Sequence, residues 1–245
     1  MKKLEYNEFE PLFGKWAPLF RNFIEGEEMF DIYQTLKNSK ETIVPKSDDT
    51  FNAFKKSKPE DIKVIWYLQD PYPRAYKNGV FQATGIAMDC SNSPDGRLQP
   101  SLEKFYETAE RETEMPVQRS TSLEYLLEQG VLLLNTGLTC KLLKSGSHTN
   151  LWLPFHKYFL ETVMRSNTGM VYVLSGDESQ KVLPYINPLG NFILKTSHPA
   201  NAAHNKIDWD SGNIFNKINN YLRGNKKEPV YWDRDLWEKI KDLPF

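Results

Sequence analysis

Residues 63–73, Lys-Val-Ile-Trp-Tyr-Leu-Gln-Asp-Pro-Tyr-Pro, decide the fold of this chain, because an apolar run of strand length ends there at two prolines. The β-branched and aromatic residues up to Leu68 predict a buried strand. Pro71 and Pro73 prevent both continued strand pairing and an immediate helix, so a rigid loop follows. A carboxylate on such a loop, at the C-terminal end of a buried parallel strand, lies where open α/β sheets bind their ligands. Asp70 is therefore the first candidate for chemistry.

The composition indicates one globular domain. The 245 residues are 40% hydrophobic and 13% aromatic, which excludes a disordered chain and allows one large core. No linker, repeat or low-complexity tract divides the chain, so we expect a single domain over residues 1–245. A helical segment at 1–42 begins it and a short tail after about residue 225 ends it. Because the formal net charge is −1, any nucleic-acid binding must rest on a local patch.

Targeting and metal-binding signals are missing from the sequence. The N-terminus carries acidic residues where a signal peptide is apolar, and the longest apolar run, 131–134, is too short to span a bilayer. We expect an intracellular protein without membrane contact, cytoplasmic in a bacterial or viral setting or nuclear in a eukaryotic host. Cys90 and Cys140 lack the close spacing of a zinc site, so we expect no metal and no disulfide.

Helical and strand patterns alternate along the chain. After the strand at 63–68, apolar runs at 131–134, 170–174 and 192–194 predict three further strands. Strands separated by helices are typically parallel and joined by right-handed crossovers. The fold class expected is therefore α/β, a three-layer sandwich with a central four-stranded parallel sheet flanked by helices.

Several local signals place the other elements. Ser101 is the expected N-cap of a helix that starts at Pro100, and residues 121–124 have the spacing of a capping box. Gly130 suits the left-handed position that ends this second helix. The short apolar patch 85–88 predicts one more strand.

Each of the four predicted strands ends in a polar group, and in a parallel sheet these groups share one edge. Taken singly, Asp70 could cap a turn, Asn135 could occupy a left-handed turn position, and His198 could be a hydrogen-bonded core residue. Their convergence favours a pocket instead. The chain has no phosphate-cradling glycine loop, nucleophile elbow or recognisable Cys-His pair. The groups at this edge are Gln69 with Asp70, Asn135, Ser175 with Gly176, and His198.

At these residues the sequence resembles the family-1 uracil-DNA glycosylases. Order and spacing of the motifs match over roughly residues 40 to 235, which is most of the chain. The resemblance implies a DNA glycosylase that acts on uracil and starts base-excision repair. The motifs are Gln69-Asp70-Pro71-Tyr72, Leu132-Leu133-Leu134-Asn135-Thr136, Ser147-His148 and Ser197-His198-Pro199, supported by Val44-Pro45 and Pro100-Ser101-Leu102.

The resemblance implies roles for the two candidate catalytic residues. Asp70 would act on the attacking water and on the positive charge that develops on the sugar. His198 would hydrogen-bond the uracil oxygen that gains negative charge. Both roles are electrostatic, and such preorganised groups need no cofactor.

Four further residues would bind the substrate. Asn135 would read the edge of uracil, since cytosine presents the opposite hydrogen-bonding pattern. Tyr72 would exclude the methyl group of thymine, Met88 would cover the ring face, and the backbone around Gln69 would complete the pocket. The base must leave the duplex to reach these groups, so base flipping is implied.

The residues implied in DNA contact depart most from the family's pattern. The family's Gly-Ser phosphate contact reads Gly176-Asp177 here, and the leucine that wedges into the vacated stack is replaced at Ala202, with Asn201 as the alternative. Pro73 stands where the family usually has histidine, a change shared with poxvirus relatives. We therefore expect a preference for single-stranded substrates. The full set of expected DNA contacts is Pro100, Ser101, Gly176, Asp177, Pro199, Asn201 and Ala202.

Three functions remain open at this point. The leading one is a monofunctional glycosylase that hydrolyses the N-glycosidic bond of uracil in DNA. The second is a catalytically weak binding subunit of a replication complex, with the N-terminal helical face and the aromatic tail 231–237 as partner surfaces. The third is a glycosylase for a modified pyrimidine, because a pocket with Met88 is roomier. We expect a monomer that binds uracil-containing DNA, with a proteinaceous inhibitor or a replication protein as a further partner.

Overall fold

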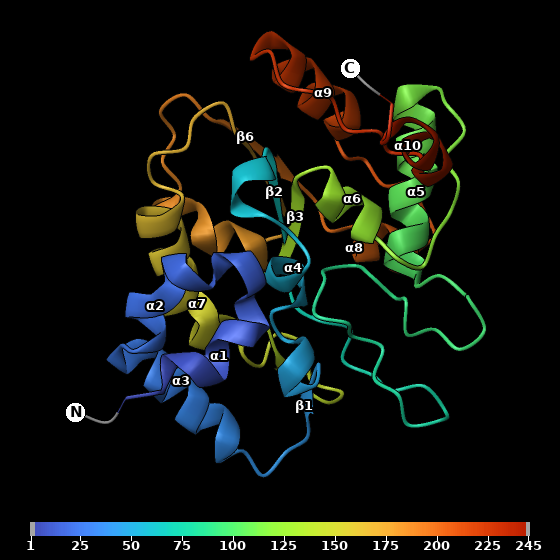
Figure 1. The fold of residues 1–245 in the computed structure, drawn as a ribbon. Helices are drawn as coiled ribbons and strands as arrows, with labels where there is room; N and C mark the ends of the chain where they lie inside the picture. The colour runs from blue at the N-terminus through green and yellow to red at the C-terminus, as the bar shows by residue number, and fades with distance from the viewer. Residues whose placement is uncertain (1–2, 244–245) are drawn as a thin grey trace.

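Four parallel strands form the centre of the molecule, in the order β3-β2-β5-β6. The computed structural model describes residues 3–243, and Figure 1 shows its ribbon. This sheet confirms the fold class expected from the alternating pattern. Its strands are β2 (Val64–Leu68), β3 (Val131–Asn135), β5 (Val171–Ser175) and β6 (Phe192–Thr196).

The register of the sheet brings the strand ends to one edge. Leu68 at the end of β2 pairs with Asn135 at the end of β3, and Ser175 of β5 pairs with Thr196 of β6. Every residue of β2, β3 and β5 is buried, which explains their continuous apolar sequences. The polar residues predicted to follow these four strands therefore lie next to one another at this edge of the sheet.

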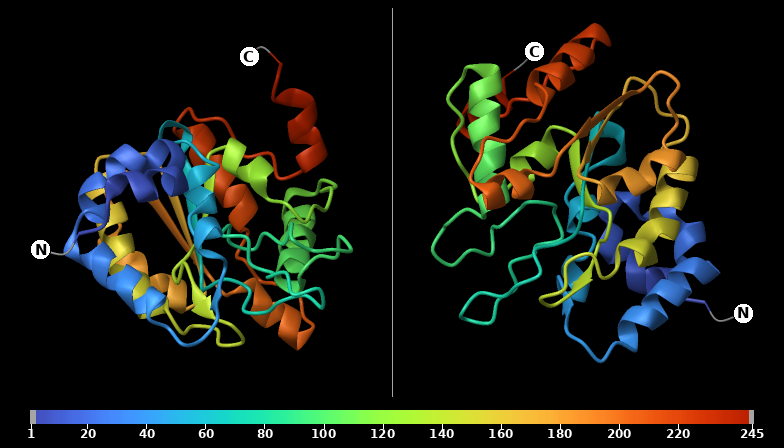
Figure 2. Two further views of the ribbon diagram at one scale, coloured as in Figure 1. Left: turned by 60° about the horizontal axis from the view of Figure 1, so that its bottom comes forward. Right: turned by 180° about the vertical axis from the view of Figure 1, so that it is seen from behind.

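Helices cover both faces of the sheet, as Figures 1 and 2 show. The first layer holds α1 (Tyr6–Phe13), α2 (Ala17–Ile24), α3 (Glu27–Lys37) and α7 (Thr149–Tyr158), which continues as a π-helical turn over Phe159–Val163. The second layer holds α5 (Pro100–Thr113), α8 (Pro199–Asn205) and α9 (Ile214–Gly224). Three further helices are short: α4 (Asn52–Lys55), which packs against α1, α6 (Glu124–Glu128), which packs against β3, and α10 (Arg234–Ile240) near the C-terminal end. A two-stranded ribbon pairs β1 (Ile43–Val44) with β4 (Cys140–Lys141).

Aromatic side chains fill the two spaces between sheet and helices. On the N-terminal side, Phe20 stacks on Phe155 with ring centroids 5.1 Å apart. On the other side, Phe215 meets Trp232 edge to face at 4.9 Å. The N-terminal helical face and the aromatic tail, two candidate partner surfaces in the sequence, thus pack largely on their own domain. Within residues 3–243 no helix has the length and apolarity to cross a membrane.

Three local expectations were wrong. The N-cap of α5 is Gln99 without a side-chain bond, so Ser101 lies inside the first turn. The N-cap of α6 is Leu123, again without a capping side chain, so residues 121–124 form no capping box. Residues 85–88 form turns rather than a strand, because Gly85 and Met88 both adopt positive φ. The left-handed Gly130 is confirmed, with φ +80°.

Candidate active site

One pocket at the C-terminal edge of the sheet gathers both predicted catalytic residues and three of the four predicted substrate-binding residues. It measures about 330 Å³ including its open mouth. The ends of β2, β3 and β6 or the loops after them supply most of its polar wall, and the turn at 83–88 supplies much of its apolar wall. Gln69, Pro100, Gly176 and Asp177 do not line it. The lining residues are Leu68, Asp70, Pro71, Tyr72, Ala83, Gly85, Ile86, Met88, Ser101, Asn135 and His198.

Asp70 is held by the loop between β4 and α7. Its Oδ1 accepts a hydrogen bond from the Ser145 hydroxyl at 3.0 Å, and its Oδ2 accepts one from the Gly146 N–H. Burial raises the pKa of the Asp70 carboxyl, and these two donors oppose that rise. The carboxylate is thereby fixed in orientation and does not merely cap a turn. Sequence reasoning missed Ser145 and Gly146, although they directly precede the Ser147-His148 motif.

Gln69 supports this arrangement from outside the pocket. Its Nε2 donates to the Ser145 oxygen at 3.0 Å, and its backbone carbonyl accepts from Gly137 at 2.9 Å. The Ser145 hydroxyl therefore accepts from Gln69 and donates to Asp70. Gln69 was expected to form part of the pocket wall, but it instead acts on the pocket indirectly, through Ser145.

Asn135 lies at the end of β3, directly beside Leu68. The next residue, Thr136, donates both its N–H and its hydroxyl to the Leu68 carbonyl, at 2.9 and 2.8 Å. Asn135 has no positive φ, so the alternative of a left-handed turn residue is wrong. It is only 7% exposed, and it lines the pocket as an amide with both donor and acceptor groups.

His198 faces the pocket as a neutral imidazole. Its Nδ1 accepts from the N–H of Ala200 at 3.0 Å as the N-cap of α8, and burial lowers its pKa to about 4. A neutral ring whose Nδ1 accepts must carry its proton on Nε2, which is left to donate. Gly176 makes room for this ring, because a Cβ there would lie 3.1 Å from the His198 Cβ.

Tyr72, Met88 and Ser101 form one hydrogen-bonded unit. The Tyr72 hydroxyl donates to the Met88 carbonyl at 3.1 Å and lies 2.8 Å from the Ser101 oxygen, which then donates to Tyr72. Met88 has φ +63°, a conformation that a non-glycine residue keeps only when its surroundings hold it. Because Ser101 is 4% exposed and bonded to Tyr72, its hydroxyl supports the pocket wall rather than facing outward for a phosphate.

The remaining expected DNA contacts divide between surface and interior. Pro100, Asp177 and Asn201 are exposed, whereas Pro199 is buried. Ala202 is 5% exposed because it lies on the side of α8 that packs against α5. The assignment of Ala202 to the DNA-wedging position is therefore wrong, and Asn201 is the neighbouring residue that faces solvent.

A second histidine that sequence reasoning missed stiffens the loop after Asn135. His156 donates from Nε2 to the Thr136 carbonyl at 2.8 Å, and its Nδ1 accepts from the Tyr67 hydroxyl at 3.2 Å. Burial lowers the pKa of His156 to about 4. Within the described residues no group of three or more His, Cys, Asp or Glu side chains is placed to hold a metal ion.

Curated relatives align with this chain over most of its length. No protein-family model matches the chain. A protein named uracil-DNA glycosylase from Pseudomonas paraeruginosa is 32% identical over 223 residues, which cover 89% of this chain and 93% of the relative. Another of that name, from Christiangramia forsetii, is 30% identical over 221 residues, covering 89% and 96%.

Solved structures show the same fold. The crystal structure of mimivirus uracil-DNA glycosylase superposes with a TM-score of 0.79 at 23% identity, covering 94% of this chain and 90% of its own. The Y322L form of the mimivirus protein, solved in complex with UGI, gives a TM-score of 0.77 at 23% identity, covering 94% and 92%. A structure from Nitratifractor salsuginis gives 0.58 at 22% identity, covering 86% and 94%.

Proposed function

Because the chain belongs to the uracil-DNA glycosylase family, we propose that the pocket of Asp70, Asn135 and His198 is where it excises uracil from DNA. The reaction is hydrolysis of the N-glycosidic bond between uracil and deoxyribose, the first step of base-excision repair. One observation carries the assignment of the site. The oriented carboxylate of Asp70, the neutral imidazole of His198 and the side-chain amide of Asn135 line the same small pocket.

The two catalytic groups match the charges that develop as the bond breaks. The sugar becomes positive, and Asp70 is a carboxylate whose two oxygens are already oriented by Ser145 and Gly146. It stabilises that charge and positions the water that attacks C1′. The departing base becomes an anion, and the Nε2–H of His198 donates to the oxygen that takes up the negative charge. Charged and hydrogen-bonding groups stabilise a transition state most effectively when they are already oriented before the reaction.

The rest of the pocket selects the base. Asn135 donates to O4 of uracil and accepts from N3–H, an arrangement that cytosine leaves unpaired at both atoms. The Tyr72 ring stands against C5, where thymine carries its methyl group. Its hydroxyl is bonded to Met88 and Ser101, so the ring cannot turn aside without breaking two hydrogen bonds. Met88 covers one face of the base as a flexible apolar platform.

The proposal also covers the subfamily, the oligomeric state, the preferred DNA strand and a protein partner. We assign the chain to family 1, as one domain over its whole length, acting as a monomer. With Ala202 buried and Asp177 exposed, the surface offers little to push a base out of a duplex. A single strand needs no unpairing, so it is the preferred substrate. A protein that occupies the mouth of the pocket, as a regulator or a replication partner, is the further partner proposed.

Release of free uracil tests the proposal. A single-stranded oligonucleotide with one central uracil is incubated with the wild-type chain, and free base is measured by chromatography. Release of uracil, together with no release of cytosine or thymine from matched strands that carry those bases, supports the assignment. A chain that binds the oligonucleotide without releasing any base would instead favour the binding-subunit function.

A further inference from the structure

A hairpin projects from the rim of the pocket. Residues 74–82 fold back on themselves, with Ala75 and Phe81 bridged in antiparallel pairing. The Tyr76 N–H donates to the Val80 carbonyl at 2.8 Å, and the Gln82 N–H donates to the Arg74 carbonyl at 2.9 Å. Figure 1 shows this segment among the teal loops that extend beyond the sheet at the lower right.

The base of the hairpin is continuous with the pocket wall. Its first arm follows Pro71 and Tyr72, and its second arm leads into Ala83 and Gly85, all four of which line the pocket. The Pro73 carbonyl accepts from the N–H of Leu143 at 2.6 Å. Leu143 lies in the loop whose Ser145 and Gly146 hold Asp70, so the hairpin adjoins the catalytic carboxylate's support.

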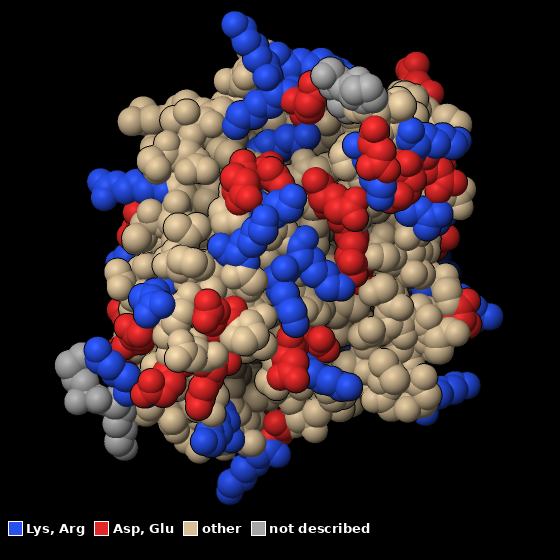
Figure 3. Space-filling view, in the orientation of Figure 1, with Lys and Arg blue, Asp and Glu red and all other residues tan. Residues whose placement is uncertain are grey.

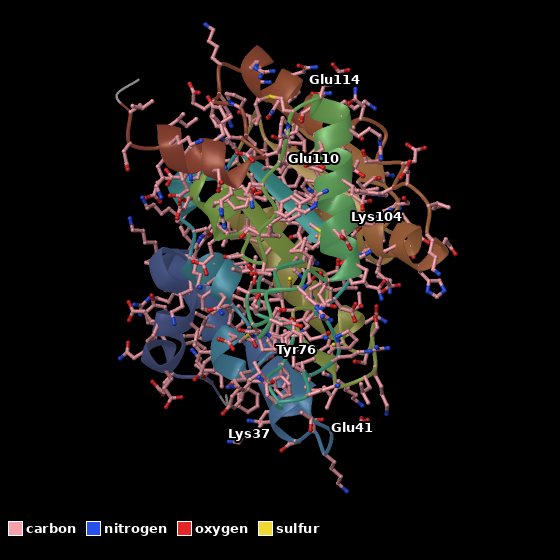
Figure 4. The ribbon with its side chains drawn as sticks, turned by 90° about the vertical axis from the view of Figure 1, so that its right-hand side faces the viewer. Lys37, Glu41, Tyr76, Lys104, Glu110 and Glu114 are labelled. Carbon is pink, nitrogen blue, oxygen red and sulfur yellow. The ribbon has the colours of Figure 1, made fainter. Side chains whose placement is uncertain are left out.

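Side-chain contacts fix the position of the hairpin. Gln99, directly before α5, donates from Nε2 to the Tyr76 hydroxyl at 3.3 Å, and Asn92 donates to the Phe81 carbonyl at 3.0 Å. Figure 4 labels Tyr76 and places it between α5 and the region of Glu41. The hairpin thus spans the space between the first turn of α5 and the loop of residues 142–147.

The charge of this segment has one sign. Arg74 and Lys77 are exposed, and the stretch from Pro71 to Met88 contains no aspartate or glutamate. Within residues 3–243 neither cation has an acidic partner at ion-pair distance. Elsewhere, positive and negative side chains are interspersed, as on the face in Figure 3, and the chain carries a net charge of −1. The hairpin is therefore a local positive patch on a molecule without a global one.

We infer that the hairpin of residues 74–82 binds the DNA strand beside the target nucleotide, with Arg74 and Lys77 contacting the flanking phosphates. This inference rests on the proposed function, because only the base of a flipped nucleotide enters the small pocket and its sugar-phosphate backbone must pass across the mouth. Two unpaired cations on a fixed support at that mouth meet the phosphates in any sequence context. They supply affinity without selecting the base.

The test compares Arg74→Gln/Lys77→Gln with wild type on a 15-nucleotide single strand carrying one central uracil. Arg223→Gln/Lys239→Gln is the matched control: it removes two exposed cations from α9 and α10, at the opposite end of the molecule in Figure 1. Each lost phosphate contact on a single strand makes the slope of log(kcat/KM) against log[salt] shallower by about 0.7. The wild-type advantage over the hairpin variant should thus shrink about sevenfold between 50 and 200 mM NaCl. Saturated turnover should stay unchanged.

Parallel salt dependences for the hairpin variant, the control and wild type would overturn the inference while leaving uracil excision intact. Failure of the proposed function has a different signature, since wild type would then release no uracil. In that case fluorescence anisotropy with a uracil-free strand of the same length still decides the role of the hairpin. Weaker and less salt-dependent binding by the hairpin variant alone supports it, and equal binding by all three proteins contradicts it.

Discussion

The hydroxyl of Ser145 donates to Oδ1 of Asp70 at 3.0 Å while it accepts from the side chain of Gln69. This relay, with the Gly146 N–H on the other oxygen, orients a carboxylate whose pKa burial has raised. The candidate catalytic group therefore depends on a loop about 75 residues away in sequence, and its ionisation depends on that loop's hydrogen bonds.

Ser145→Ala should lower turnover and move the acidic limb of the rate profile to higher pH. Removing a donor to the charged form raises the pKa of Asp70 further, so a higher pH is needed to keep it ionised. Ser145→Thr keeps a hydroxyl and should restore the wild-type profile. The measurement is kcat/KM for uracil release from pH 4.5 to 9. An acidic limb that does not move in the alanine variant would mean that Ser145 does not act on Asp70.

His198→Ala should reduce turnover by about 10²–10³-fold, the usual loss for one donor to a developing anion. Because burial lowers the pKa of His198 to about 4, the wild-type imidazole is neutral throughout the range from pH 6 to 8. Its protonation should therefore produce no change in rate across that range. Steady-state uracil release by the two proteins at pH 6, 7 and 8 provides the check. Wild-type turnover by the alanine variant would remove His198 from the mechanism.

Tyr72→Ala should admit thymine, because it opens the space that faces C5 of the base. It also removes the hydrogen bond that holds the Met88 carbonyl, so uracil excision should slow as well. Asn135→Asp should admit cytosine while leaving thymine excluded, since a rearranged carboxyl can present the complementary pattern. Base release is measured on matched strands with uracil, thymine or cytosine. Unchanged rejection of thymine by Tyr72→Ala, with full uracil activity, would place the gate at another residue.

Ala202→Leu should destabilise the protein by about 1–3 kcal/mol, the usual cost of overpacking, because Ala202 is buried against α5. It should not improve activity on duplex. Asn201→Leu, on the exposed side of α8, should raise the duplex rate relative to the single-strand rate. Denaturant unfolding and uracil release from paired and unpaired strands test the two variants. A gain in duplex activity with Ala202→Leu, without loss of stability, would reverse this assignment of the helix faces.

The parallel sheet could be predicted from the sequence alone, and so could the position of the two catalytic candidates, Asp70 and His198, at its edge. Continuous apolar runs followed by polar residues indicate buried parallel strands, and the pairing of Leu68 with Asn135 follows from that arrangement. The pocket then collects Asp70, Asn135 and His198 because parallel strands end at the same edge.

The residues that surround and hold the catalytic candidates could not be predicted from local sequence patterns. Ser145 and Gly146 reach Asp70 through a loop whose path depends on tertiary packing, and Ser101 looked like an N-cap because its local sequence fits one. The burial of Ala202 depends on the position of α8 against α5, which no local pattern specifies. The hairpin at 74–82 is short and carries no strong strand signal, so only the structure reveals its place at the pocket rim.

Single-turnover release of uracil by wild type and Asp70→Asn, with oligonucleotide affinity measured in parallel, tests the central claim most directly. The variant keeps the shape of the side chain and removes the charge that matters in the transition state. We expect base release to fall severely while the dissociation constant for the uracil strand changes little. Full residual release by Asp70→Asn, or a loss of affinity that matches the loss of rate, would contradict the assignment of Asp70 as the catalytic carboxylate.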